Sequence, residues 1–151
     1  MYQLSPEYYP DPTPAAAVAR VMSAVCSPPP RGSSRPPVPR RERPVVYICS
    51  PFSGNEEVNR HRARAFCRFA VRSGYLPIAP HLLFPQFMDD SDPDERELAL
   101  SFCNVLLGKC HQLWVFGDRI SEGMAREIGR ARRRAMRIRY FTNDFEEVYP
   151  E

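Results

Sequence analysis

The chain has 151 residues, a formal net charge of +3 and 43% hydrophobic residues. This length favours a single domain with its own core. The small excess of positive charge gives no reason to expect nucleic-acid binding. No apolar stretch approaches the ~20 residues of a membrane span, and the N-terminus lacks the basic and then apolar pattern of a signal peptide. We therefore expect a cytoplasmic protein with no membrane partner.

Residues 1–43 differ in composition from the rest of the chain. They are rich in Pro and Arg and include Pro28-Pro29-Pro30. Such a density of proline excludes a helix interior or a central strand, so we predict a largely disordered arm, with room for a short helix at residues 15–25. The arm is either a solvated tail or a segment whose Arg side chains contact an acidic partner. Residues 44–151 are predicted to form the folded domain.

Strand and helix patterns alternate along residues 44–151. Four short apolar runs are predicted strands: residues 45–49, 75–79, 112–116 and 138–141. Three helices are predicted between them: residues 56–73, 93–108 and 121–135. Residues 81–92 show no clean period, and we expect a long loop over the strand ends.

The predicted helices carry capping residues and apolar stripes. We expect Gly74 to end the first helix, Asp92 or Ser91 to cap the second, and Ser121 to cap the third. The stripes expected to face the core are Val58, Arg62, Ala65, Phe66, Phe69 and Ala70; Leu98, Phe102, Val105 and Leu106; and Met124, Ile128, Ala131 and Ala135.

Alternation of this kind produces a parallel sheet with right-handed crossovers. We predict a three-layer α/β fold, flavodoxin-like or Rossmann-like, with a parallel sheet of four to five strands. Ligands of such sheets bind beyond the carboxyl ends of the strands, where the strand order reverses. The turns at residues 50–55 and 117–123, after the first and third predicted strands, are expected to face that crevice.

The turn at residues 50–55 combines Ser50, Ser53 and Gly54 with the start of a helix. Hydroxyls, backbone N–H groups and a helix N-terminus suit a phosphate or sugar hydroxyls. The turn has neither a Walker sequence nor the GxGxxG pattern, and an ordinary strand-to-helix cap is the alternative.

Glu127 lies one helical turn beyond Gly123, between the predicted core residues Met124 and Ile128. It either pairs with Arg130 or Arg134 on the helix surface or faces the ligand crevice, and we favour the crevice. Glu122, in the first turn, is expected to interact with the helix dipole.

The cysteines are five in number, irregularly spaced and without a Cys-x-x-Cys pair. We expect buried reduced thiols at Cys26, Cys49, Cys67, Cys103 and Cys110. No His/Cys set has metal-ligand spacing, and Asp89-Asp90-Ser91-Asp92 is expected to solvate a loop and cap a helix rather than hold Mg²⁺. We predict no metal and no cofactor.

Two segments resemble the nucleoside 2-deoxyribosyltransferase-like superfamily: Tyr47-Ile48-Cys49-Ser50-Pro51-Phe52-Ser53-Gly54 and Gly123-Met124-Ala125-Arg126-Glu127-Ile128-Gly129. An uncharacterised bacterial and phage branch is closer still, marked by segments like those at residues 77–87 and 113–117. The resemblance covers roughly residues 44–142. It implies the α/β fold and oligomers, dimers or larger, in which a neighbouring subunit closes the site.

The resemblance also implies roles for individual residues. Glu127 matches the nucleophile, and Tyr47 matches an aromatic residue that orients it, although a core tyrosine is the alternative. Asn104 stands near the place of a family acid and cannot donate a proton as a carboxylic acid does; Asp89, Asp90, Asp92 or Asp94 could replace that acid. His81 could contact phosphate or act as an acid, or be a satisfied loop histidine. The substrate-binding residues expected are Ser50, Pro51, Phe52, Ser53, Gly54, His81, Ser121, Gly123 and Met124.

The function implied is cleavage of an N-glycosidic bond, or deoxyribosyl transfer, on a nucleoside or nucleoside 5′-monophosphate, in the two steps of a retaining glycosidase. A second hypothesis is a non-catalytic nucleotide-binding or regulatory module with the same fold. A third is an interaction protein whose Pro/Arg-rich arm recruits a partner.

Overall fold

The computed structural model describes residues 42–149. The predicted arm, apart from its last two residues, lies outside the described residues. The elements in chain order are β1 (Val45–Cys49), α2 (Glu56–Arg72), β2 (Leu76–Ile78), α3 (Pro80–Leu83), the 3₁₀ helix η2 (Phe84–Gln86), α4 (Pro93–Lys109), β3 (Gln112–Phe116), α5 (Glu122–Arg133), β4 (Arg137–Phe141) and β5 (Glu147–Val148).

The strands form one sheet in the order β2-β1-β3-β4-β5. β1, β2, β3 and β4 are parallel, and β5 adds an antiparallel edge to β4. This order confirms the predicted flavodoxin-like α/β fold with a sheet of four to five strands, although the fifth strand is antiparallel and not parallel as expected. The chain leaves β1 towards one edge of the sheet and returns with β3 on the other side of β1, so the order reverses between β1 and β3.

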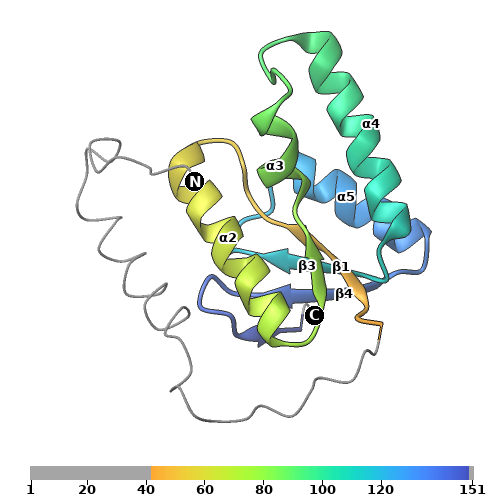
Figure 1. Cartoon of the computed structure of the whole chain (residues 1–151). Coiled ribbons are helices and arrows are strands. Elements are labelled where there is room, and N and C mark those ends of the chain that lie inside the picture. The colour runs from red at the N-terminus through yellow and green to blue at the C-terminus, as the bar shows by residue number, and fades with distance from the viewer. Residues whose placement is uncertain (1–41, 150–151) are drawn as a thin grey trace. The chain divides into compact units, whose positions relative to one another are not determined.

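Side chains of β1 and β3 alternate between two cores, because successive residues of a strand point to opposite faces. On one face Val46, Ile48, Trp114 and Phe116 pack with Phe66 of α2. The other face carries a second cluster: Tyr47, Cys49, Leu113 and Val115 with Leu107 of α4 and Met124, Ile128 and Ala131 of α5. Helices therefore cover both faces of the sheet, in three layers (Figure 1).

Helix α2 follows the predicted pattern with one shift. Phe66 and Ala70 are buried as expected, but Ala63 is buried and Arg62 is exposed. A long charged side chain is placed on the solvent side when a small residue nearby can fill the contact with the sheet. After the helix, Gly74 adopts φ +91°, which confirms it as the glycine that ends the helix.

The loop predicted at residues 81–92 is wrong in its first part. Pro80 opens α3, and η2 follows directly. Proline at the first position of a helix needs no hydrogen-bonded N–H and has its φ already set. Pro80 therefore ends β2, as predicted, and also starts a helix, which the lack of a clean period concealed.

Helix α4 has the predicted start but not the predicted face. Asp92 caps it through a hydrogen bond from the Asp94 N–H (2.9 Å). Leu98, Phe102 and Val105 are 48%, 40% and 56% exposed, whereas Leu107 is buried. The first half of α4 rises beyond the sheet (Figure 1), so only its last turns have a core to pack against.

Helix α5 begins as predicted, with the Ser121 Oγ accepting a hydrogen bond from the Met124 N–H (3.3 Å). Met124, Ile128 and Ala131 are buried. Ala135 is not: it is exposed and adopts φ 53° two residues beyond the helix. The left-handed backbone turns the chain into β4 and moves this residue off the helical stripe.

Candidate active site

A pocket of about 540 Å³ opens at the carboxyl ends of β1 and β3. Its wall comes from the turn after β1, from α3, from the first half of α4 and from the start of α5. Seven of the predicted site residues line it: Ser50, Phe52, Ser53, His81, Ser121, Gly123 and Glu127. The pocket therefore lies at the reversal of strand order, where the sequence placed the crevice.

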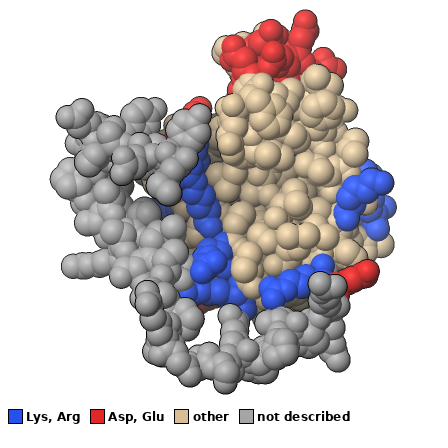
Figure 2. Space-filling view, in the orientation of Figure 1, with Lys and Arg blue, Asp and Glu red and all other residues tan. Residues whose placement is uncertain are grey.

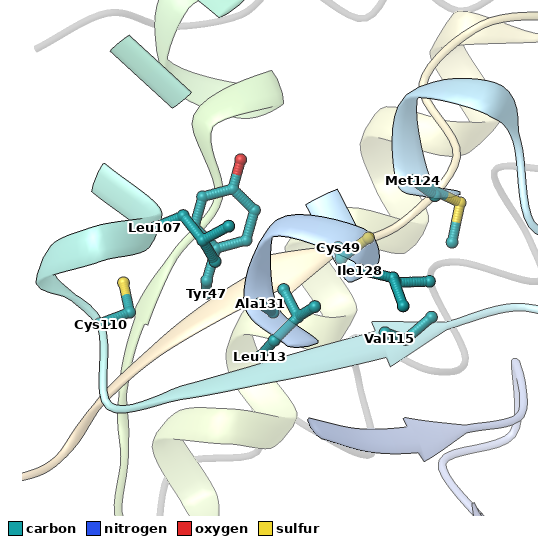
Figure 3. Packing of buried hydrophobic residues seen from close by; sticks show 9 residues of the cluster. All are labelled: Tyr47, Cys49, Leu107, Cys110, Leu113, Val115, Met124, Ile128 and Ala131. Atoms are coloured by element: carbon teal, nitrogen blue, oxygen red, sulfur yellow. The ribbon is translucent and has the colours of Figure 1, made fainter. Parts of the chain in front are cut away.

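Glu127 reaches β1 from α5 and meets Tyr47. The Tyr47 hydroxyl donates a hydrogen bond to the Glu127 Oε1, 2.6 Å away. The Tyr47 side chain is 1% exposed and points to the α5 face of the sheet. In Figure 3 its ring stands beside Leu107 with the oxygen directed away from the strand. Glu127 thus reaches from α5 to Tyr47 in the middle of β1, and not to Arg130 or Arg134 on the helix surface as the alternative had it.

The surroundings of Glu127 shift its protonation in both directions. Burial raises the pKa of its carboxyl, whereas hydrogen bonds from Tyr47 and Cys49 and the charge of Arg130 lower it, and the net direction is upward. Burial, followed by the charge of Glu127, raises the pKa of both Tyr47 and Cys49. Both groups thus remain protonated donors, and the carboxylate is held between them on the wall of the pocket.

Ser50 and His81 form a second pair in the pocket. The Ser50 side chain is 7% exposed, and its Oγ lies 3.0 Å from the His81 Nε2. His81 sits in the first turn of α3, just after Pro80. Burial lowers the pKa of His81 to about 4, so its imidazole is neutral at pH 7. A neutral imidazole and a hydroxyl can exchange hydrogen bonds with a ligand but add no charge to the site.

The turns after β1 and β3 touch each other. Gly117 adopts φ +109°, and a Cβ at this position would lie 3.6 Å from the Pro51 Cδ. A second pocket of about 440 Å³ lies beside this contact and shares Ser53 and Ser121 with the first. Pro51 lines this second pocket only, together with Arg62 and Arg119.

Four predicted residues, Tyr47, Asn104, Met124 and Gly54, do not line either of these pockets. The Asn104 Oδ1 instead accepts a hydrogen bond from the Arg134 Nη2, at 3.2 Å. Met124 is a core residue, 3% exposed. Gly54 adopts φ +100° in the turn before α2, with open space around it. Of the four carboxylates considered as substitutes for the family acid, Asp89 and Asp90 line the first pocket, and Asp92 and Asp94 do not.

The part of the pocket made by α4 was not predicted from the sequence. Arg96, Ala99, Leu100 and Cys103 line it, and the Cys103 thiol contacts the Tyr47 hydroxyl. These residues recur at helical spacing and lead to the buried Leu107. This spacing indicates the inner face of α4, which lies about one residue away from the predicted apolar stripe of Leu98, Phe102, Val105 and Leu106.

The other predicted features of the described residues are structural. The His111 Nδ1 accepts a hydrogen bond from the Val45 N–H at 3.0 Å. Cys49 and Cys110 are buried free thiols, as expected, whereas Cys67 and Cys103 are free but only partly buried; Cys26 lies outside the described residues. Within residues 42–149, no group of three or more His, Cys, Asp or Glu side chains could hold a metal ion. In the same range no helix is long and apolar enough to cross a membrane.

Comparisons with known proteins agree with this architecture. A solved 2-deoxyribosyltransferase from the psychrotolerant bacterium Bacillus psychrosaccharolyticus superposes with a TM-score of 0.54 at 19% identity, covering 70% of this chain and 77% of that one. This likeness confirms the fold that the sequence resemblance implied. No curated protein matches the chain. A family model matches residues 44–141, and the chain therefore belongs to the family described as "Domain of unknown function (DUF7768)".

Proposed function

We propose that this protein cleaves N-glycosidic bonds of nucleosides or nucleoside 5′-monophosphates, with Glu127 as the nucleophile. The observation that carries the proposal is the Tyr47–Glu127 hydrogen bond of 2.6 Å at the wall of the pocket. A carboxylate that is partly buried, held by a phenol and open to a cavity is suited to attack an electrophilic carbon. The shared fold of a 2-deoxyribosyltransferase supports the same chemistry.

In the first step one Glu127 oxygen attacks C1′ of the sugar and the base leaves, which gives a glycosyl ester. Tyr47 and Cys49 hold the carboxylate in one orientation, so that little freedom is lost at the moment of attack. In the second step water, or a second base, attacks C1′ and releases the Glu127 carboxylate. With water as the acceptor the protein is a hydrolase, and with a second base as the acceptor it is a deoxyribosyltransferase.

The remaining polar residues of the pocket are assigned to the sugar or its phosphate. Ser50, Ser53 and Ser121 supply hydroxyls, and the Ser121–Gly123 turn opens α5 with its positive dipole end. His81 is neutral and bonded to Ser50, which fits a positioning role for a sugar hydroxyl. Asn104, turned towards Arg134, is given no part in catalysis.

The second candidate is a nucleotide-binding module without turnover. The observation in its favour is that Asn104, near the place of a family acid, is neither acidic nor in the pocket. The third candidate, recruitment of a partner through residues 1–43, lies outside the described residues.

Release of free base distinguishes the first two candidates. The protein is incubated with 2′-deoxynucleosides and their 5′-monophosphates, and chromatography follows the base. We expect release that Glu127→Gln abolishes and that Glu146→Gln, at an exposed site away from the pocket, preserves. Binding without release, unchanged in Glu127→Gln, would establish the module instead.

A further inference from the structure

The pocket that holds Glu127 is strongly acidic. Its lining includes six carboxyl side chains, Glu56, Asp89, Asp90, Glu95, Glu122 and Glu127, against two guanidinium groups, Arg96 and Arg126, a formal balance of −4. Both arginines already pair within the pocket wall. Arg96 lies 3.8 Å from Asp90 and Arg126 bonds Glu122. Figure 2 shows the acidic end of the molecule above the start of α4.

The neighbouring pocket has the opposite balance. It contains Arg62 and Arg119 against Asp118 alone, and the Asp118 carboxylate accepts a hydrogen bond from the Asn143 amide (2.8 Å). Charges of one sign around a cleft raise the local concentration of ligand groups of the opposite sign, so the two pockets attract ligand groups of opposite sign. An anionic group of a ligand is favoured on the arginine side, and a cationic group beside Glu127.

Apart from Glu127, the described lining groups of the acidic pocket that have a shifted pKa are poor proton donors for a leaving base at neutral pH. Hydrogen bonds from Ser91 lower the pKa of Asp89. Burial lowers the pKa of His81 to about 4 and raises the pKa of the Cys103 thiol to about 11. An uncharged purine or pyrimidine leaves as an anion unless an acid protonates it in the transition state. These lining residues are thus poorly suited to help an uncharged base leave.

We propose that the substrates are N-glycosides of a cationic base, such as an N-alkylated purine or a pyridinium. The inference rests on the proposed function and narrows its substrate class. A positive base is attracted by the surplus carboxylates of the pocket. It departs as a neutral molecule and needs no acid.

The electron and proton balance of the reaction is complete with water as the co-reactant. A Glu127 oxygen forms a bond to C1′ while the C1′–N bond breaks, and that electron pair neutralises the positive ring. Water then forms a bond to C1′, the ester C–O bond breaks, and its electron pair restores the carboxylate. The products are the neutral base, the free sugar and one proton.

The test uses two substrates that differ by one methyl group and one charge, 2′-deoxyguanosine and 7-methyl-2′-deoxyguanosine. Base release is measured for each with the full-length protein, after subtraction of the spontaneous rate. Binding of each is measured with Glu127→Gln. We expect the methylated nucleoside to show the larger ratio of kcat/KM to the rate constant of its own spontaneous cleavage. It is also expected to bind at least about tenfold more tightly, because its positive charge is complementary to the charge of the pocket.

Charge variants show whether the pocket is the cause. Glu95→Gln removes one lining carboxylate, and Glu97→Gln removes an exposed carboxylate two residues along α4 that does not line the pocket. Glu95→Gln is expected to lower the binding preference for the methylated nucleoside by about two- to fivefold, and Glu97→Gln to leave it unchanged.

The outcomes separate this inference from the proposal it rests on. Cleavage of 2′-deoxyguanosine that equals or exceeds that of its methylated form, and that depends on Glu127, overturns the cationic substrate class and leaves the glycosidase intact. Release of neither base above the spontaneous rate overturns both. A preference for the methylated nucleoside that survives Glu95→Gln and changes in Glu97→Gln overturns the role of the pocket carboxylates.

Discussion

Tyr47 and Glu127 are 80 residues apart in the chain and share one short hydrogen bond. Tyr47→Phe keeps the ring in the core and removes the donor. Loss of a hydrogen bond to a charged group costs about 1.5–3 kcal/mol, so kcat is expected to fall roughly 10- to 100-fold.

The same substitution has a pH signature, because the Tyr47 hydrogen bond lowers the pKa of Glu127. Without that bond the pKa rises further, and the acidic limb of the kcat/KM profile moves to higher pH. Tyr140→Phe is the control: its hydroxyl contacts Arg132 at 3.4 Å, away from the pocket. If the acidic limb of the kcat/KM profile lies at the same pH in Tyr47→Phe as in wild type, Tyr47 only packs in the core and does not set the pKa of Glu127.

Glu127 is predicted to reduce stability at neutral pH. Its folded pKa lies above the usual 4.5, so its contribution to stability is complete below that value and is lost as pH rises through the raised pKa. The amide introduced by Glu127→Gln can still accept the Tyr47 hydrogen bond. Because it does not titrate, its contribution to stability does not change with pH. We expect urea unfolding at pH 7 to show the variant about 0.5–2 kcal/mol more stable than wild type, with a smaller difference at pH 4. An equal difference at both pH values would contradict this assignment.

Individual site residues differed in how far the sequence could locate them. Ser121 and Gly123 belong to a local pattern, a cap and a glycine at a helix start, and a few residues decide such patterns. The lining residue Cys103 and the distant Asn104 depend on the rotation of α4, where an error of one residue turns a side chain by about 100°. That rotation is set by what α4 packs against, which the sequence of the helix does not contain.

At the level of helices and turns, Gly117 and Gly129 differ in backbone conformation, so substitution by alanine is expected to have opposite effects on stability. Gly117→Ala places a side chain at φ +109° in the turn beside Pro51 and is expected to cost about 1–2 kcal/mol. Gly129→Ala lies inside α5, where the nearest atom belongs to the flexible Arg133 side chain at 3.6 Å, and is expected to stabilise by roughly 0.5–1 kcal/mol. Chemical denaturation of both variants checks the pair, and the same sign for both would contradict it.

The strands were predictable and α3 was not, for a physical reason. β1 and β3 are apolar runs buried on both faces, bounded by polar turns, and parallel sheets require such runs. Helix α3 has four residues, too few to establish a period, and only Pro80 marked its start. Short helices that form part of a ligand pocket are decided by tertiary contacts more than by their own pattern.

At the scale of the whole molecule, the resemblance predicted a homo-oligomer, and we propose that a second copy covers α4. This helix exposes Leu98, Phe102 and Val105 at helical spacing, an apolar surface of the kind that marks an association site. Val105→Glu is expected to convert the protein to monomers in light scattering after size exclusion. The control Val148→Glu, on exposed β5, should change nothing. A monomeric wild type at every concentration tested would refute the oligomer.

The predicted division into an arm and a domain implies that the domain folds without the arm. A chain that starts at residue 42 contains every strand and both core clusters that the structure describes. It is therefore expected to unfold cooperatively, with a midpoint within about 2 °C of the full chain, since a solvated tail contributes little to stability. A large drop in the midpoint, measured by circular dichroism, would show that the first residues are part of the fold.

The central claim is that the Glu127 carboxylate forms a covalent bond to the sugar. The most direct measurement is mass spectrometry of the protein quenched in acid during turnover of a 2′-deoxynucleoside, followed by peptide mapping. We expect one deoxyribosyl group per chain on the peptide that contains Glu127, and none in Glu127→Gln. Base release that continues in Glu127→Gln, or a sugar attached to another side chain, would contradict it.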